Sequence, residues 1–179
     1  MHARCSPGFS LIEVLVAVLL LSIGILCAAG AQVASSRTRQ GTGLMSNAVQ
    51  LASTLADRMR ANSTQMPAYL QLQYDASGQG APSPGAICLG GARCTAAQIA
   101  AFDAYDIKQA LYTGFPGGRV VVCRDEGRAV MAWECAGGTA SPIVIKVGWR
   151  GKRADGAHDA DAAGQFAPSV ALAVGGAFP

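Results

Sequence analysis

The sequence predicts an α+β fold in which a long N-terminal helix, membrane-spanning in its first half, packs on a small antiparallel sheet. Three observations predict it. A run of apolar residues without any charge extends from residue 14 to 31, a helical pattern continues beyond it, and short strand-like segments are confined to the second half of the chain. At 179 residues the chain has room for one modest globular domain besides the apolar segment.

The apolar N-terminal run is long enough to cross a membrane. The first eight residues are polar and weakly basic, and residues 9–31 are apolar with a single acidic residue, Glu13. An uncharged apolar run of about 18 residues or more spans the bilayer core as a helix, at about 1.5 Å per residue. Arg4 precedes the run and is expected to stay cytoplasmic, which places the rest of the chain on the other side of the membrane.

Three ordinary interpretations of this run each leave a feature unexplained. A secretory signal cleaved at Ala29–Ala31 does not account for the acidic Glu13 in its apolar region. A lipoprotein signal ending at Cys27 requires a small residue where Leu26 stands, so we reject it. A plain membrane anchor does not explain Glu13 either, because an ionisable residue in a spanning helix is costly and therefore indicates a function.

Residues 8–14, with the sequence GFSLIEV, resemble the type III signal of type IV prepilins and pseudopilins. In that family a membrane-bound prepilin peptidase cuts after the glycine and N-methylates the new terminal residue. The resemblance therefore implies that residues 1–8 are a leader, that the chain is cleaved between Gly8 and Phe9, and that Phe9 is methylated. Glu13 becomes the fifth mature residue, the assembly glutamate of the family, while Ser10 stands where threonine is commoner.

The chemistry of Glu13 is consistent with a role in assembly. Opposite the terminal amine of Phe9 in a neighbouring subunit, its carboxylate and that amine neutralise each other in an apolar environment. Loss of one partner from such a buried pair leaves an uncompensated charge, at a cost of about 3–5 kcal/mol. The pair can therefore set the register between subunits. The alternative is a carboxylate that reaches the membrane edge without a partner.

The helix is expected to continue through residues 32–61 as an amphipathic segment. Apolar residues recur there at helical spacing: Leu44, Ala48, Leu51, Leu55 and Met59. Gly41 and Gly43 interrupt the pattern and each costs about 1 kcal/mol relative to alanine, so we expect one long helix with a weak point near Gly41.

Residues 62–179 are expected to form the globular head. The stretch 61–94 is rich in Gly, Pro and Ser and is predicted to be a surface loop. A second helix follows it, because Thr95 and Gln98 form a capping box. Its apolar stripe is predicted to comprise Ile99, Phe102, Ile107, Ala110 and Leu111. Asp103 and Asp106 project into this stripe, and we interpret them as buried side chains bonded to backbone groups or a loop rather than as a catalytic pair.

Two or three antiparallel strands complete the predicted head. Residues 119–124 form one strand, and residues 143–149 form the clearest one, because Ile143, Ile145, Val147 and Trp149 alternate with Val144 and Lys146. A weaker strand is expected at about residues 165–174. Sheet and long helix together give an α+β head.

Four of the six cysteines lie in the head, namely Cys88, Cys94, Cys123 and Cys135. An even set of this kind is typical of an oxidising compartment such as a periplasm. A zinc site requires short C-x-x-C spacings, which these cysteines lack. The spacing therefore favours two disulfide bonds over a metal site, and four cysteines allow three connectivities.

Four segments narrow the family resemblance: residues 56–62, residues 101–111 with the Pro-Gly-Gly that follows them, residues 122–125 and residues 144–149. They resemble the PilV family of minor pilins, and they imply a type IV pilin-like fold. One departure is Ile107, where that family often has tryptophan. The resemblance implies a low-abundance subunit of the type IV pilus that primes or modifies pilus assembly and so supports motility, adhesion or DNA uptake.

The same resemblance implies the location and the partners. The chain is expected in the inner membrane as a single-pass protein with its C-terminal head in the periplasm, and afterwards in the pilus. Its expected partners are the prepilin peptidase, the major pilin, other minor pilins and the inner-membrane assembly platform.

For the disulfides we choose Cys88–Cys94 with Cys123–Cys135. A hairpin between residues 119–123 and 130–133 would leave Cys135 about 14–17 Å from Cys123 at ~3.4 Å per residue, too far for a bond. We favour the bond over the hairpin, because Gly137, Gly138 and Pro142 leave little room for a regular return strand and the PilV-like segment implies a closed loop. Residues 124–135 are then expected to be mostly irregular.

Other classes of function fit the sequence less well. The net charge of +3 is not clustered, so nucleic acid is not indicated as a partner. Loss of the leader removes His2 and leaves His158 as the one histidine, which argues against a histidine-dependent enzyme, and we expect no metal and no cofactor. The main alternative is a minor pseudopilin of a type II secretion system. Another is a tip module that binds a ligand through loops 61–94 or 150–165.

Overall fold

The computed structural model describes residues 10–85, 87–90, 93–126, 132–151 and 166–175. The chain divides into two compact units, residues 1–40 and residues 41–179. Helix α1 (Leu11–Ala61) contributes to both units and continues through Gly41 and Gly43 without interruption. The predicted single long helix is therefore present.

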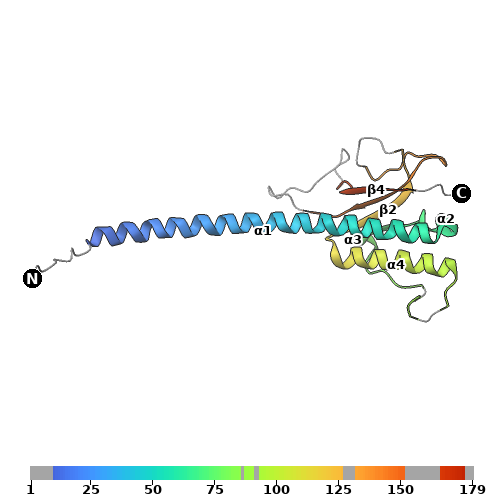
Figure 1. Cartoon of the computed structure of the whole chain (residues 1–179), viewed down its shortest axis with the longest axis horizontal. Helices are drawn as coiled ribbons and strands as arrows, with labels where there is room; N and C mark the ends of the chain where they lie inside the picture. The colour runs from blue at the N-terminus through green and yellow to red at the C-terminus, as the bar shows by residue number, and fades with distance from the viewer. Residues whose placement is uncertain (1–9, 86, 91–92, 127–131, 152–165, 176–179) are drawn as a thin grey trace, which may run out of the picture. The chain divides into compact units, whose positions relative to one another are not determined.

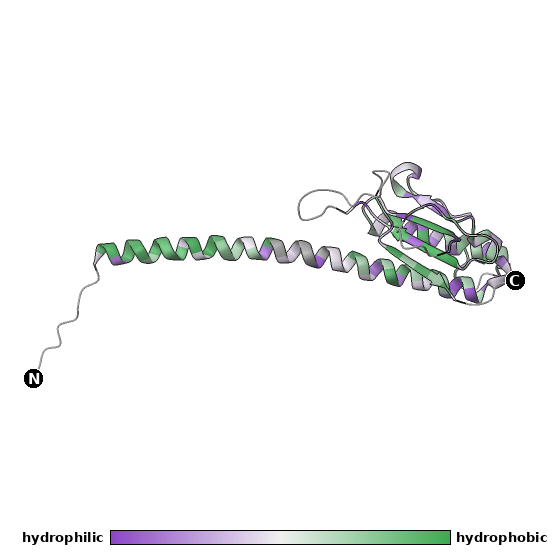
Figure 2. Cartoon of the chain, turned by 90° about the horizontal axis from the view of Figure 1, so that it is seen from above, coloured by the Kyte–Doolittle hydropathy of each residue, from purple (hydrophilic) through white to green (hydrophobic). Residues whose placement is uncertain are grey.

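The second half of α1 carries the apolar face on which the head is built. Five of its residues are at most 1% exposed: Ala48, Ala52, Leu55, Ala56 and Met59. They recur three or four positions apart and so lie on one side of the helix. Leu44 and Leu51, which were expected on the same face, are only partly buried and pack at its margin. Figure 2 shows that polar residues alternate with apolar ones in this half of the helix.

The region between α1 and the second long helix contains more structure than the surface loop expected from its composition. It forms a 3₁₀ helix, η1 (Ser63–Gln65), a short helix α2 (Met66–Tyr69), a strand β1 (Gln73–Asp75) and a further short helix α3 (Ala76–Gln79). Four of its side chains, Met66, Tyr69, Leu72 and Tyr74, are buried in the core. That prediction was wrong for residues 63–79, because elements of three or four residues are too short to show a periodic pattern.

Helix α4 (Ala96–Gly114) begins with the predicted capping box, in which Thr95 Oγ1 accepts from Gln98 N–H and Gln98 Oε1 accepts from Thr95 N–H. Its buried residues are Ala100, Asp103, Ile107 and Leu111. The predicted stripe was correct for Ile107 and Leu111, whereas Phe102 and Ala110 are only partly buried. It was wrong for Ile99, which is 39% exposed. The buried face includes the polar Asp103, as expected.

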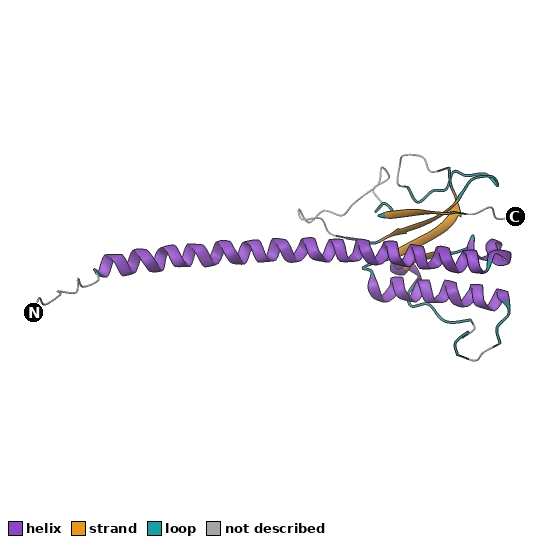
Figure 3. Ribbon diagram, in the orientation of Figure 1, coloured by secondary structure: helices purple, strands orange, loops and turns teal. Residues whose placement is uncertain are grey.

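The sheet has four antiparallel strands in the order β1-β2-β3-β4, one more than expected (Figure 3). Strand β2 (Arg119–Arg124) has the predicted bounds, whereas β3 (Ile143–Gly148) ends one residue before Trp149. Strand β4 (Val170–Val174) begins later than expected. The extra strand is β1, which pairs with β2 through Tyr74 opposite Val120.

One face of the sheet joins α1 and α4 in a single hydrophobic core (Figure 1). Val120, Val122 and Ile145 of the sheet are fully buried there, together with Leu55 of α1 and Leu111 of α4. The alternation in β3 is as predicted, since Ile143, Ile145 and Val147 belong to this core. The predicted fold class, a long helix packed on a small antiparallel sheet, is confirmed.

Candidate functional site

The predicted processing position lies partly outside the described residues. Gly8 and Phe9 are not among them, whereas Glu13 is in the first turn of α1 and is exposed. The turn is closed by backbone bonds from the N–H groups of Glu13 and Val14 to the carbonyl of Ser10, at 3.0 and 3.3 Å. A carboxylate in the first turn interacts favourably with the helix dipole. Glu13 is therefore presented on an ordered helical turn.

By length and composition alone, the segment Leu11–Val33 of α1 is the one helix of the described chain that is long and apolar enough to cross a membrane. Its 23 residues extend about 35 Å as a helix, against about 30 Å for the hydrocarbon core of a bilayer. Its large apolar side chains are between 49% and 79% exposed. The hydroxyl of Ser22 donates to the carbonyl of Val18 at 2.7 Å, so the helix itself satisfies this polar group.

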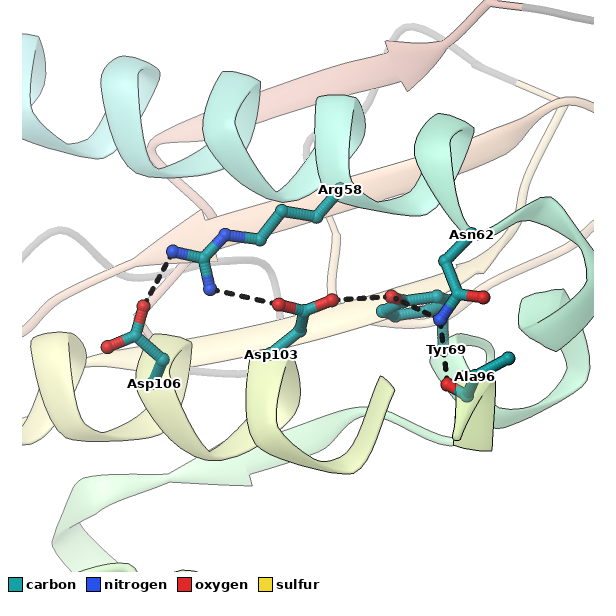
Figure 4. A network of polar contacts seen from close by, with 6 residues as sticks. All are labelled: Arg58, Asn62, Tyr69, Ala96, Asp103 and Asp106. Atoms are coloured by element: carbon teal, nitrogen blue, oxygen red, sulfur yellow. Dashed lines mark hydrogen bonds and ion pairs between the residues drawn. The ribbon is translucent and has the colours of Figure 1, made fainter. Parts of the chain in front are cut away.

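A polar network centred on Asp103 connects three helices of the head (Figure 4). Arg58 Nη1 of α1 lies 3.1 Å from Asp103 Oδ1 of α4, and the hydroxyl of Tyr69 in α2 donates to Asp103 Oδ2 at 2.6 Å. Asn62 Nδ2 donates to the Tyr69 oxygen at 3.4 Å and to the carbonyl of Ala96 at 2.9 Å. Burial and the bond to Asp103 raise the pKa of the Tyr69 hydroxyl, which therefore stays protonated as a donor.

This network corrects the expectation for the two aspartates. Asp103 is buried as expected, but its partners are side chains and not backbone groups: Arg58 of α1, and Tyr69 from the stretch that was expected to be a loop. Asp106 is half-exposed and lies 2.7 Å from Arg58 Nη2, so a single guanidinium bridges both carboxylates. Each of these groups is occupied by an intramolecular partner, and the network fixes α1, α2 and α4 together.

A second polar cluster surrounds Lys146 on the opposite face of the sheet. Lys146 is only 4% exposed, and its ammonium group donates to the carbonyls of Ala132 and Glu134 at 2.8 and 2.7 Å. It also pairs with the carboxylate of Asp125. The hydrogen bond from Lys146 holds the pKa of Asp125 below its usual value. The buried charge is thus neutralised by the chain that follows β2.

Aromatic side chains complete the cover of this second face. Trp133 and Phe166 lie edge to face, with ring centroids 5.5 Å apart, and Trp133 Nε1 donates to the Phe166 carbonyl. The guanidinium of Arg119 lies 4.4 Å from the centroid of the Trp133 ring. A glycine is required at position 148, next to the Trp133 ring, because a Cβ at that position would lie 2.9 Å from the ring. The chain after β2 therefore folds back over β2 and β3.

The four cysteines of the head face each other in two pairs, Cys88 with Cys94 and Cys123 with Cys135. The Cα–Cα distances are 6.0 and 6.2 Å, inside the range of about 4.4–6.8 Å that a disulfide requires. The described residues after Arg124 lack a strand until Ile143, in agreement with the expected irregular connection. The one free cysteine of the described chain is Cys27, exposed in the apolar half of α1.

Sequence reasoning did not identify three residues that organise the head, namely Arg58, Tyr69 and Lys146. Lys146 was placed on the same face of its strand as Val144, but no local sequence pattern indicates the partners of these three side chains. The described residues contain no group of three or more His, Cys, Asp or Glu that could hold a metal ion. His158 lies outside them.

Two protein-family models match the chain. The prokaryotic N-terminal methylation motif matches residues 4–28, which include Gly8, Phe9 and Glu13. A model described as type IV pilin Tt1218 matches residues 30–105, from the middle of α1 into α4. Neither the curated proteins nor the solved structures contain a match to the chain.

Proposed function

We propose that this chain, which belongs to the type IV prepilin family, is a minor pilin that primes or modifies assembly of a type IV pilus. Type IV pilins are structural subunits, so the role proposed is structural and not catalytic. The observation that carries the proposal is the methylation motif. The motif overlaps an exposed apolar helix, and Glu13 lies in the first turn of that helix. The PilV-like segments of the sequence favour a minor pilin.

We assign each segment of the chain a role in processing, membrane insertion or assembly. The prepilin peptidase removes residues 1–8 and methylates Phe9. Residues 9–31 hold the protein in the inner membrane and later pack in the filament, residues 32–61 support the head, and residues 62–179 form a periplasmic head with the two disulfides. In the filament, Glu13 pairs with the terminal amine of a neighbouring subunit. The partners are the major pilin, other minor pilins and the assembly platform.

The processing step is tested on the mature protein by mass spectrometry. We expect the chain to begin with N-methyl-phenylalanine at Phe9, and we expect Gly8→Ala to be cleaved poorly. The matched control is Ser10→Thr, which restores the commoner residue beside the cut and should be processed normally. A mature N-terminus at Gln32 would instead assign the segment to ordinary secretion.

The assembly step is tested with Glu13→Ala. Because the carboxylate is assigned to pairing between subunits, the variant should enter the membrane and be cleaved, yet fail to enter pili or to support surface pili and twitching. Normal assembly of the variant would reduce Glu13 to a tolerated group at the membrane edge.

The second candidate is a minor pseudopilin of a type II secretion system, which the same N-terminal motif favours equally. Deletion of the gene distinguishes the two systems. Loss of surface pili and twitching with normal protein secretion supports the pilus, whereas the converse supports the secretion system.

A further inference from the structure

An open groove lies on the head between α4 and the loop formed by residues 79–85. It has a volume of about 310 Å³, and its wall is mostly polar. Besides Tyr74, the polar side chains that line it are Gln79, Ser83, Tyr105 and Lys108. This volume is at the lower end of the range of about 300–1,000 Å³ for small-molecule sites, so a fitting ligand has the size of one or two sugar rings.

The loop that forms one wall of the groove is held in place without a ligand. Tyr74, at the base, is only 4% exposed, and its hydroxyl donates to the carbonyl of Gly80 at 2.6 Å. Gly80 has a φ of 67°, a conformation that favours glycine. Asp75 Oδ1 accepts from the Ser77 N–H at 2.9 Å, and Pro82 restricts the rim further. A wall ordered in advance lowers the entropic cost of binding.

Apart from the Tyr74 hydroxyl, the polar side-chain groups of the groove are not used by the described part of the head. Within that part, no hydrogen bond or ion pair involves the side chains of Gln79, Ser83 or Lys108, or the hydroxyl of Tyr105. Lys108 is the one charged residue of the lining, so the site favours an anion. The other three supply an amide and two hydroxyls, each able both to donate and to accept.

These groups match the chemistry of a sugar acid. A carboxylate accepts from the Lys108 ammonium in a charge-assisted bond, and the ring hydroxyls exchange bonds with the amide and hydroxyl groups. Tyr105 also offers a partly exposed ring beside Ala101, against which the apolar C–H face of a sugar can pack. An acidic peptide is less well matched, because the mostly polar lining lacks the apolar pockets that peptide recognition uses.

We propose that this groove binds a single acidic sugar unit, such as a uronic acid, with its carboxylate on Lys108 and its hydroxyls on Gln79, Ser83 and Tyr105. The inference goes beyond assembly, because it gives the head a binding activity of its own. It does not depend on whether the filament is a pilus or a secretion pseudopilus.

The test uses the full processed chain in detergent micelles, titrated with glucuronate, glucose and acetate and followed by calorimetry. Glucuronate should bind saturably and more tightly than either glucose or acetate. Lys108→Gln should weaken glucuronate binding about tenfold or more and Tyr105→Phe about threefold, as expected for the loss of a charged and of a neutral hydrogen bond. The matched control is Arg93→Gln, which removes a cation that does not line the groove and should bind as the wild type does.

The thermal unfolding of each variant is measured in parallel, so that a loss of binding is not a loss of fold. Three results would overturn the proposal. They are absence of saturable glucuronate binding to the folded wild type, unchanged binding by Lys108→Gln, and acetate or a glutamate-rich peptide binding as tightly as glucuronate.

Discussion

The two halves of α1 have the same secondary structure and opposite environments. In Leu11–Val33 the large apolar side chains are 49–79% exposed, whereas five residues of the second half are at most 1% exposed. The first half consists mainly of Leu, Val and Ile, with alanines among them, whereas three of the five residues on the buried face of the second half are alanines. Hydropathy therefore identifies the half whose large apolar side chains are exposed. Burial of small residues identifies the half that the head covers.

A leucine, a cysteine and an acidic residue in the first half of α1 can each be compared with a residue of the same kind in residues 41–179. Leu20, Cys27 and Glu13 are exposed in the first half. Leu55 is buried in the second half, and Cys135 and Asp103 lie in the head that it supports. Both tryptophans of the chain, Trp133 and Trp149, belong to the head, so their fluorescence reports its unfolding in detergent.

The leucine pair is expected to show the largest difference. Leu55→Ala should lower the free energy of unfolding of the head by about 2–5 kcal/mol, because it leaves a cavity at a fully buried site. Leu20→Ala should leave the same unfolding transition unchanged, since its side chain is 63% exposed. Urea titration followed by tryptophan fluorescence measures both. Equal effects would show that the head depends on the first half of the helix.

The cysteine pair, Cys135 and Cys27, is expected to show the second-largest difference in the free energy of unfolding. Cys135→Ser opens a loop with a sequence separation of 12, which in the chain-entropy account costs about 3 kcal/mol. It should also loosen the cover of Lys146, because Ala132 and Glu134 lie in that loop. Cys27→Ser should have no effect on unfolding. Peptide mapping without reductant checks the pairing itself, and Cys88 or Cys94 joined to Cys123 or Cys135 would contradict it.

For the acidic pair, Asp103 and Glu13, the expected difference in the free energy of unfolding is smaller. Asp103→Asn keeps the shape of the side chain but weakens its bonds with Arg58 and Tyr69, so we expect a loss of about 1–3 kcal/mol. Tyr69→Phe should cost about 1 kcal/mol. Glu13→Gln should leave the unfolding of the head unchanged, although it is expected to impair assembly. Thermal melting of the three variants, recorded side by side, tests this order.

The smallest expected effect is a dependence on pH that only the head should show. Because Lys146 lowers the pKa of Asp125 in the folded state, the pair contributes stability above the unfolded pKa of about 4. That contribution is lost as the pH falls through the lowered pKa of the folded state. The wild type should therefore melt above Asp125→Asn at neutral pH, and the difference should shrink below about pH 4. A constant difference from pH 7 to pH 3 would contradict this assignment.

The features that the sequence predicted are local ones. The capping box of Thr95 and Gln98, the alternation in β3 and the motif from Gly8 to Glu13 each occupy a few contiguous residues. The features that it missed depend on distant partners. Strand β1 forms because it pairs with β2, and Arg58 meets Asp103 across 45 positions of the sequence. The sequence places Lys146 opposite the apolar side of its strand, but its burial depends on a loop that folds back over it.

The order of the strands has a consequence for the time at which the head can form. The sheet that covers the buried face of α1 runs in sequence order and ends at Val174, 113 residues after the end of the helix at Ala61 (174 − 61). At about 5–20 residues per second, synthesis of that distance takes about 6 to 23 s. During this interval the apolar face around Leu55 exists without the strands that later bury it. A newly made chain therefore carries this face without its complete cover until strand β4 has been synthesised.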